Sequence, residues 1–191
     1  MAGITELNNR IADSDQPSAQ ILDLKIFSIN VNSLVSHSKR HELIKFLESH
    51  NPDIVLLCET KLNKRHKVQF SDYEIIRTDR PNSQKGGGTA ILIKRDLNIS
   101  WSQIYSPSSL RNEILEYTII QLNLNNSKKL FIVSVYANNE YRNIFTNELN
   151  QLFSSLKLNN LDNYFIVAGD LNARQISWGD VNSNYKGFLL N

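Results

Sequence analysis

The stretch Asp53-Ile54-Val55-Leu56-Leu57-Cys58-Glu59-Thr60-Lys61 contains a run of apolar residues that stops abruptly at charged ones. Because the run is apolar on both faces of an extended chain, it predicts a central strand that is covered on both sides. Glu59 follows directly, on the strand face that Val55 and Leu57 define. A carboxylate in that position is costly unless a cation or hydrogen bonds compensate for it. The stretch therefore predicts a layered core with a polar site at the strand end.

The segments around this strand alternate between strand and helix patterns. Residues 24–29 are rich in β-forming side chains, and residues 39–50 carry an apolar stripe at helical spacing, with Ser36 or Ser38 as a cap and Asn51-Pro52 as the end. The glycines at 86–88 are interpreted as turn backbone. Further strands are predicted over 73–77, 89–93, 113–124, 130–136 and 165–168, and a second helix over 140–157. This interleaving predicts a layered α/β fold.

Length and composition indicate one globular domain. The 191 residues fit a single domain at roughly 150 residues per domain. With 41% hydrophobic and 21% charged residues, the chain is neither a collagen, a pure coiled coil nor wholly disordered. Residues 1–20 are polar and aperiodic, so we expect a disordered leader there and the domain over 21–191. The net charge of +2 is too small to indicate nucleic-acid binding by itself.

The few cysteine and histidine residues limit the metal and redox chemistry. Cys58 is the single cysteine, and we interpret it as a small buried thiol in a reducing compartment. The four histidines have no paired ligand spacing, which argues against a structural zinc site. Neither a signal-peptide pattern nor an apolar run of ~20 residues is present, so we expect an intracellular protein without a membrane segment.

Polar side chains follow four of the predicted apolar strands at the points where the strands end. In layered sheets such loops carry function on a rigid frame. Two carboxylates, several amides and a phenol supply hard oxygen ligands for Mg²⁺ and neutral donors for phosphate oxygens, and no Ser-His-Asp or Cys-His set is evident. These residues, which predict metal-assisted phosphodiester chemistry, are Asn30, Asn32, Glu59, Tyr136, Asn138, Asn139, Asp170 and Asn172.

Each of these residues also has a purely structural interpretation. Asparagine and aspartate favour turns, so Asn30, Asn32, Asp170 and Asn172 can be turn residues. Glu59 can begin a helix, and Tyr136 can belong to the core. Trp178 fits core packing as well as a site. A basic loop beside Glu59 is either a solvated surface or a set of contacts to DNA phosphates. That loop contains Lys61, Lys64, Arg65 and Lys67.

The order of the strings resembles that of the endonuclease/exonuclease/phosphatase superfamily, and most of all the apurinic-type endonuclease domain of non-LTR retrotransposons. The most specific strings are Glu-Thr-Lys at 59–61 and Gly-Asp-Leu-Asn at 169–172, and the triple glycine and Trp178-Gly179 favour the retrotransposon branch. The resemblance implies a four-layer α/β sandwich of two mixed sheets flanked by helices. The other matching strings are residues 29–34, 53–58, 86–91 and 135–139.

The resemblance also implies roles for the polar residues. Glu59 would be the main ligand of Mg²⁺ or Mn²⁺, and Asn32 occupies a metal-site position that is Asp in the repair relatives. Asn30 would support the metal and the scissile phosphate, which Tyr136 would contact. Asp170 would orient or deprotonate the attacking water.

Further contacts to phosphate and DNA are implied in the same way. Asn172 would hold a phosphate oxygen, and Asn139 matches the Asn of the family's Tyr-x-x-Asn string. Lys61, Lys64 and Arg65 would contact DNA. The implied reaction hydrolyses one DNA strand and leaves a 3′-hydroxyl that primes reverse transcription. The expected partners are therefore DNA and a reverse transcriptase domain in a full element, in the nucleus.

Three departures from the family pattern affect this interpretation. Ser33 replaces the usual Gly, and Gln175 stands where retroelement relatives often carry His. The closing Ser-Asp-His string of the family is absent, and none of the four histidines lies in such a string. We therefore expect a C-terminally truncated sandwich, missing its last strands, with weak or no nicking activity. The alternatives are a non-catalytic remnant that binds nucleic acid or a partner, and a phosphoesterase that acts on other phosphoesters.

Overall fold

The computed structural model describes residues 4–11, 22–80, 86–105, 114–124, 128–138, 144–157 and 163–190. They form two mixed sheets, of strand order β1-β2-β3-β5-β4 and β6-β7-β8-β9. The β2–β3 and β8–β9 pairs are parallel and the others antiparallel. The elements are β1 (Ile4–Ile11), β2 (Leu22–Asn30), α1 (His37–His50), β3 (Ile54–Cys58), β4 (Tyr73–Thr78), β5 (Thr89–Lys94), β6 (Trp101–Ile104), β7 (Leu115–Asn123), β8 (Lys129–Ala137), α2 (Phe145–Ser155), β9 (Asn163–Asp170), η3 (Ile176–Trp178) and α3 (Tyr185–Leu190).

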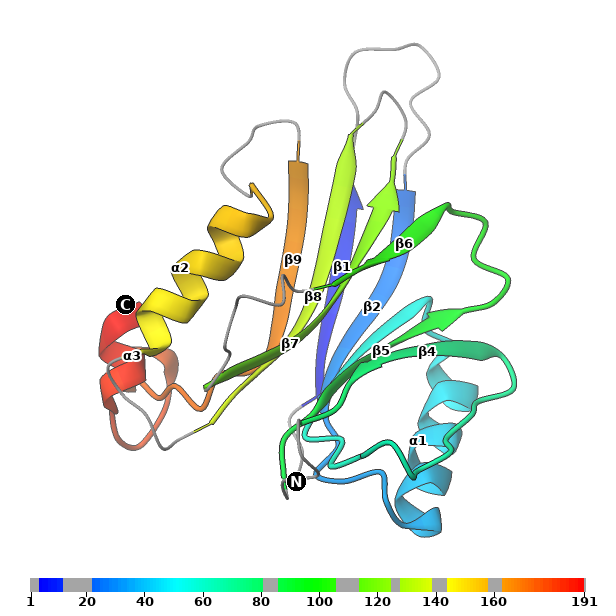
Figure 1. Cartoon of the computed structure of the whole chain (residues 1–191), viewed down its shortest axis with the longest axis horizontal. Helices are drawn as coiled ribbons and strands as arrows, with labels where there is room; N and C mark the ends of the chain where they lie inside the picture. The colour runs from blue at the N-terminus through cyan, green and yellow to red at the C-terminus, as the bar shows by residue number, and fades with distance from the viewer. Residues whose placement is uncertain are drawn as a thin grey trace.

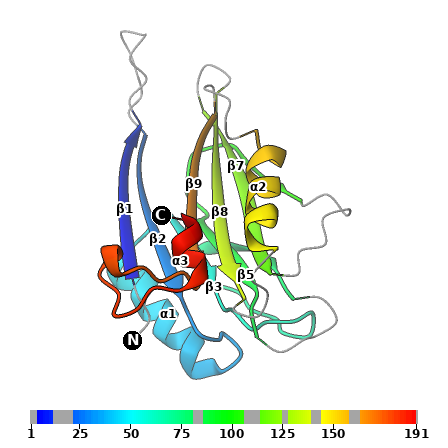
Figure 2. The ribbon, with the colours of Figure 1, turned by 90° about the vertical axis from the view of Figure 1, so that its left-hand side faces the viewer.

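The sheets lie face to face, with α1 outside the five-stranded sheet and α2 outside the four-stranded one (Figures 1 and 2). Side-chain alternation along the strands produces these layers. In β2, Ile26 belongs to the core between the sheets, whereas its neighbour Phe27 packs with Leu43 and Leu47 of α1. This arrangement is the predicted α/β sandwich of two mixed sheets flanked by helices.

The local signals of the first helix and the central strand are confirmed. The Ser36 hydroxyl accepts a hydrogen bond from Lys39 N, and Asn51 ends α1 in the left-handed conformation. All five residues of β3 are buried. The Cys58 thiol is free and buried, as expected. Among the described residues, no helix is long and apolar enough to cross a membrane.

Four segments differ from expectation. Within residues 1–20, where we expect a disordered leader, residues 4–11 form β1, which pairs with β2 over eight residue pairs. This pairing uses main-chain groups and needs no apolar periodicity. Strand β9 lies at a sheet edge and Phe165 is 50% exposed, so it is not the buried strand that its apolar run indicates. Strand β6 and helix α3 were not predicted, and the turn at 125–127 lies outside the described residues.

Candidate active site

The space between the two sheets changes from apolar to polar along its length. Strand β8 illustrates the change, because Ile132 packs in the inter-sheet core, the Ser134 hydroxyl donates to Leu57 O of the other sheet at 2.8 Å, and Tyr136 follows on the same face. In β9, the face that begins at Ile166 ends at Asp170. In β2, the face of Ile26 ends at Asn30. The candidate site is therefore the polar end of the inter-sheet layer.

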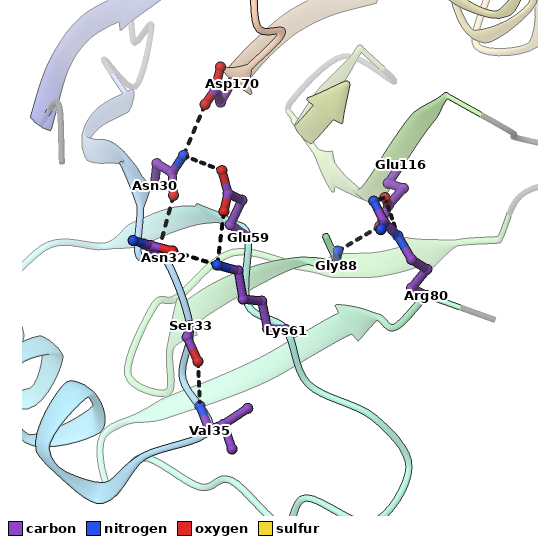
Figure 3. A network of polar contacts seen from close by, with 10 residues as sticks. All are labelled: Asn30, Asn32, Ser33, Val35, Glu59, Lys61, Arg80, Gly88, Glu116 and Asp170. Atoms are coloured by element: carbon purple, nitrogen blue, oxygen red, sulfur yellow. Dashed lines mark hydrogen bonds and ion pairs between the residues drawn. The ribbon is translucent and has the colours of Figure 1, made fainter. Parts of the chain in front are cut away.

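The amide of Asn30 joins two carboxylates that come from different sheets (Figure 3). Its Nδ2 donates to Glu59 Oε1 at 3.0 Å and to Asp170 Oδ2 at 2.9 Å. Its Oδ1 accepts from Asn32 N at 3.0 Å. Residues that are 29 and 140 positions from Asn30 in sequence thus meet at one side chain. The predicted site residues Asn30, Glu59 and Asp170 are brought together.

A left-handed backbone directs Glu59 toward Asn30. Its φ is 55°, a conformation that non-glycine residues seldom adopt and that often marks functional sites. Extended backbone would continue the Val55 and Leu57 face toward α1, as the alternation predicts. That expectation is wrong because the chain leaves strand geometry after Cys58.

The ammonium of Lys61 lies between Glu59 and Asn32, the two residues predicted to hold a metal. Its Nζ is 3.3 Å from Glu59 Oε2 and donates to Asn32 Oδ1 at 2.5 Å. A side-chain cation therefore lies where these two oxygen atoms converge, which shows that their arrangement suits a positive charge. Asn32 and Lys61 also have left-handed backbones, with φ of 44° and 54°.

Main-chain hydrogen bonds hold the Glu59 loop from both sides. On one side, Ser33 N donates to Glu59 O and Leu34 N to Thr60 O, both at 2.8 Å. On the other side, Thr60 N donates to Gly88 O at 3.1 Å and Lys61 N to Gly87 O at 2.8 Å. The triple glycine is thus turn backbone, as predicted, and also a support for the loop that carries Glu59.

The Asp170 loop is held by asparagine side chains. Asp170 Oδ1 accepts from Asn172 N at 2.8 Å, and Asn172 Nδ2 donates to Ala137 O at 2.9 Å, which ties the ends of β8 and β9 together. Asn184, just before α3, donates from Nδ2 to Asn172 O at 2.8 Å, and its Oδ1 accepts from Arg174 N at 3.0 Å. Sequence reasoning missed Asn184, although a polar residue that precedes a helix is a typical cap.

Burial and neighbouring charges keep the acidic protons at the site in place. The pKa of Tyr136 is raised by burial and then by the carboxylates of Glu59, Asp170 and Glu116, while Arg80 opposes the rise. Its phenol is therefore a neutral hydrogen-bond donor at physiological pH. Burial raises the pKa of Cys58 to about 12, and the charge of Asp170 adds to the effect.

A buried lysine from α3 approaches the same region. Lys186 donates to Asn138 O at 2.6 Å, and its Nζ lies 5.2 Å from the ring centre of Phe145. Burial lowers the pKa of Lys186, whereas the negative charge of Asp170 opposes the decrease. No sequence pattern predicts this placement, since a lysine on a short helix usually faces solvent.

None of the described contacts joins Lys64, Arg65 or Trp178 to this centre. Lys64 and Arg65 are exposed, and Asn139 lies outside the described residues. Trp178 is 48% exposed, so it does not pack in the core. Gln175 is buried and accepts from Ser183 Oγ.

The four histidines take no part in the described contacts of the site. Three lie on α1, where His50 stacks on Phe46 at 4.3 Å between ring centres. The fourth, His66, accepts from Asn63 N in its own loop. The described part of the site therefore contains carboxylates, amides, a phenol and ammonium groups.

The donor set fits a hard divalent cation. An all-protein metal cage needs three or more His, Cys, Asp or Glu side chains that converge. Within the described ranges there is no such group. Magnesium sites commonly have one or two carboxylates and complete their coordination with water and substrate phosphate. Glu59, with the Asn32 amide beside it, meets that description. The arrangement suits phosphate chemistry in which part of the coordination comes from the substrate.

Sequence comparisons find a family model and several relatives that are similar to this chain. A family model described as "Endonuclease/Exonuclease/phosphatase family" matches residues 27–190. The RNA-directed DNA polymerase from mobile element jockey of Drosophila melanogaster is 27% identical over 167 residues, which is 87% of this chain and 17% of that protein. Its counterpart in Drosophila funebris is 26% identical over 149 residues, 78% of this chain and 15% of that protein. The chain thus spans about a sixth of these relatives.

Solved structures show the same fold. The AP endonuclease LMAP from Leishmania major superposes with a TM-score of 0.68 at 18% identity, over 85% of this chain and 60% of that one. The D. rerio TDP2 complexed with single-strand DNA product superposes with a TM-score of 0.54 at 21% identity, over 82% of this chain and 63% of that one.

Proposed function

The chain belongs to the endonuclease/exonuclease/phosphatase family, and we propose that it hydrolyses phosphodiester bonds of DNA with the aid of a divalent cation. The junction of Glu59, Asn30 and Asp170 at the polar end of the inter-sheet layer carries this proposal. The amide keeps the two carboxylates apart, so that each is available for a separate task. Such separation suits a reaction that needs both a cation and a water-directing group.

The cation would be held by Glu59 with support from Asn32, and Mg²⁺ or Mn²⁺ suits these oxygen ligands. When bound, it would supply charge neutralisation and Lewis acidity at the phosphate. We infer that Lys61 contacts a DNA phosphate once the cation occupies the position between Glu59 and Asn32.

The remaining residues would act on the water and the phosphate. Asp170 would accept a hydrogen bond from the attacking water and so orient a lone pair of the water oxygen toward phosphorus. The neutral phenol of Tyr136 would donate to a non-bridging oxygen, because its raised pKa keeps the proton in place. The Asn172 side chain would contact the same phosphate.

The relatives extend the proposal to the whole protein. The jockey proteins are named as RNA-directed DNA polymerases of a mobile element. We therefore propose that this chain acts beside a reverse transcriptase and nicks DNA to provide a 3′-hydroxyl primer, which would require access to the nucleus. Lys64, Arg65 and Asn139 are proposed to contact the DNA.

The rate of residues 1–191 is expected to be low. No histidine belongs to the described site, and loss of a positioned acid or base typically costs about 10²–10⁴-fold in rate. We therefore propose that these residues bind cation and DNA and cleave slowly.

A nicking assay on supercoiled plasmid with Mg²⁺ tests this function. We expect slow relaxation that EDTA abolishes and that Asp170→Ala reduces to background, while Glu42→Gln, a change on the exposed face of α1, has no effect. Fusing the terminal segment of a complete relative should raise the rate, and Asp170→Ala should abolish the gain. DNA binding without cleavage in the fused protein would favour the non-catalytic remnant. Hydrolysis of bis(p-nitrophenyl) phosphate without plasmid nicking would favour a different phosphoester substrate.

A further inference from the structure

An ion pair lies beside the site, on two residues for which the sequence alone predicts no role. Arg80 follows β4 in one sheet, and Glu116 belongs to β7 in the other. Arg80 Nε and Nη2 donate to Glu116 Oε1 at 2.8 Å and 2.5 Å. The two side chains are only 16% and 13% exposed, so this pair is far better shielded from water than an ordinary surface pair. In the sequence, Glu116 is a charged residue on the same strand face as Thr118 and Ile120, the face of β7 that points toward the other sheet.

The same carboxylate also holds the triple-glycine turn. Glu116 Oε2 accepts from Gly88 N at 2.5 Å (Figure 3). A Cβ at Gly87 would overlap both carboxylate oxygens of Glu116, and a Cβ at Gly88 would lie 2.5 Å from Thr60 Oγ1. The turn is therefore packed between Glu116 on one side and the Glu59 loop on the other, and a side chain at Gly87 or Gly88 would have to displace Glu116, Arg80 or Thr60.

The turn passes this constraint to Glu59 through the main chain. Gly87 O and Gly88 O accept from Lys61 N and Thr60 N, the two residues that follow Glu59. Glu59 is the point where the chain turns left-handed. A conformation of this kind persists only where its surroundings impose it. The link from Glu116 through the turn to residues 60 and 61 is such a constraint.

The position of Glu116 also relates the two halves of the site. Glu116 pairs with Tyr136 in the β7–β8 register, and β8 pairs with β9 so that Tyr136 lies beside Asp170. One carboxylate on the four-stranded sheet thus contacts the turn that supports Glu59 on the five-stranded sheet. If it were lost, Arg80 and Gly88 N would lose a shielded acceptor, which is more costly than losing a solvated pair.

We propose that Glu116, held by Arg80, is a positioning residue that fixes the Glu59 loop relative to Tyr136 and Asp170. Removing its charge releases the glycine turn, and Glu59 then loses its fixed direction toward Asn30. The effect on cation binding rests on the proposed function, whereas the effect on the loop does not.

The first experiment measures the loop without any activity. Amide hydrogen exchange is followed residue by residue by NMR in the wild-type chain, Glu116→Gln and Glu42→Gln, which removes a carboxylate from an exposed ion pair. We expect exchange at Thr60, Lys61 and Gly88 to accelerate about tenfold or more in Glu116→Gln only, with β3 still protected. Unchanged exchange at these amides would overturn the proposal.

The second experiment separates positioning from mere support of the fold. Mn²⁺ is titrated into the same three proteins by calorimetry, and we expect about tenfold weaker binding in Glu116→Gln, in the range seen for outer partners of metal ligands. Faster exchange with unchanged Mn²⁺ affinity would also overturn the proposal. Absence of Mn²⁺ binding in the wild-type chain would instead count against the proposed function, and the exchange data would then decide the proposal about the loop.

A steric variant tests the same link without changing any charge. Gly87→Ala places a methyl group against the Glu116 carboxylate and should reproduce the local exchange increase, even if Glu116→Gln does not fold. In a Glu116→Ala background, where the obstructed carboxylate is gone, Gly87→Ala should add only the backbone cost of alanine at a φ of 59° and its contact with Arg80. Additive effects would show that the turn and the carboxylate act independently, and would contradict the proposal.

Discussion

The two halves of the site are held by different means. Main-chain hydrogen bonds on both sides support the Glu59 loop of the five-stranded sheet, where Asn32, Glu59 and Lys61 are all left-handed. The Asp170 half continues a regular strand, and side-chain amides such as those of Asn172 and Asn184 hold the loop that follows. The first half thus depends on its backbone neighbours and the second on a few particular side chains.

This difference determines how each half responds to mutation. A left-handed non-glycine residue costs roughly 1–2 kcal/mol, and the Glu59 loop offsets that cost with several hydrogen bonds to different segments. Single side-chain changes should therefore disturb it only where they reach the supporting turn. In the Asp170 half, single changes should remove several bonds at once.

The largest effect is expected at the end of β9. Gly169 has a φ of 150°, and a Cβ there would overlap the main chain of Val135. Gly169→Ala should therefore separate β8 from β9 next to Asp170 and destabilise the fold by more than about 3 kcal/mol in urea unfolding. Gly179→Ala is the matched control, because its φ is 93° and nothing lies within 4 Å of its Cβ, so only the roughly 1 kcal/mol backbone cost is expected. Equal losses in both variants would mean that close strand packing is unimportant there.

A smaller effect is expected at Asn184. Its side chain bonds to Arg174 N, Gly187 N and Asn172 O, and alanine would remove all three bonds. Asn184→Ala should lower the free energy of unfolding by about 1–3 kcal/mol and accelerate amide exchange at Asn172. Asn98→Ala, an exposed asparagine, should change neither. Unchanged exchange at Asn172 would contradict the role of side-chain amides in this half.

Alkaline pH should lower the free energy of unfolding, because buried acidic groups lose their protons more readily in the unfolded chain. Cys58 has a pKa raised from 9.0 to about 12, so the folded protein keeps a proton that the unfolded chain loses above pH 9. Stability should be fully present below pH 9 and fall between pH 9 and about 12, with a slope of at most about 1.4 kcal/mol per pH unit from this thiol. Urea unfolding as a function of pH measures the slope, and Cys58→Ala should reduce it. Tyr73, with a pKa raised from 10.0 to about 12, accounts for a residual slope above pH 10.

The smallest effect concerns the basic loop next to the Glu59 half. Replacing Lys61, Lys64 and Arg65 with alanine should weaken DNA binding at low salt and reduce the slope of log K against log salt by about two to three, if each contacts a phosphate. Lys45→Ala, on α1, is the control for a general change in charge. A salt slope that the triple variant leaves unaltered would make this loop a solvated surface.

The core strands and the first helix could be predicted from the sequence because their signals are local. The apolar run of β3 and the serine cap of α1 each report their own structure. Strand β1 could not be predicted in this way, since its pairing with β2 uses main-chain groups. The exposure of β9 depends on which strand lies beside it, and no local pattern encodes that.

The sequence predicts the residue types and motifs of the site, but it does not predict their geometry. Asn30 and Asp170 continue the inter-sheet faces of their strands by simple alternation, whereas alternation misdirects Glu59 because the chain leaves the extended region there. The Arg80–Glu116 pair joins residues 36 positions apart in two different sheets. Such a contact follows from how the sheets stack, and the sequence shows only a charged residue on the inward face of β7, not its partner.

The most direct test of the central claim is whether Glu59 and its neighbours hold a divalent cation. The melting temperature of the 191-residue chain is measured against Mg²⁺ concentration, for the wild-type protein, Glu59→Gln and Glu42→Gln. Because a ligand that binds the folded state stabilises it by RT ln(1 + [L]/Kd), the melting temperature of the wild-type protein and of Glu42→Gln should rise with Mg²⁺, and that of Glu59→Gln should not. An equal rise in all three proteins, or no rise in any, would contradict the account.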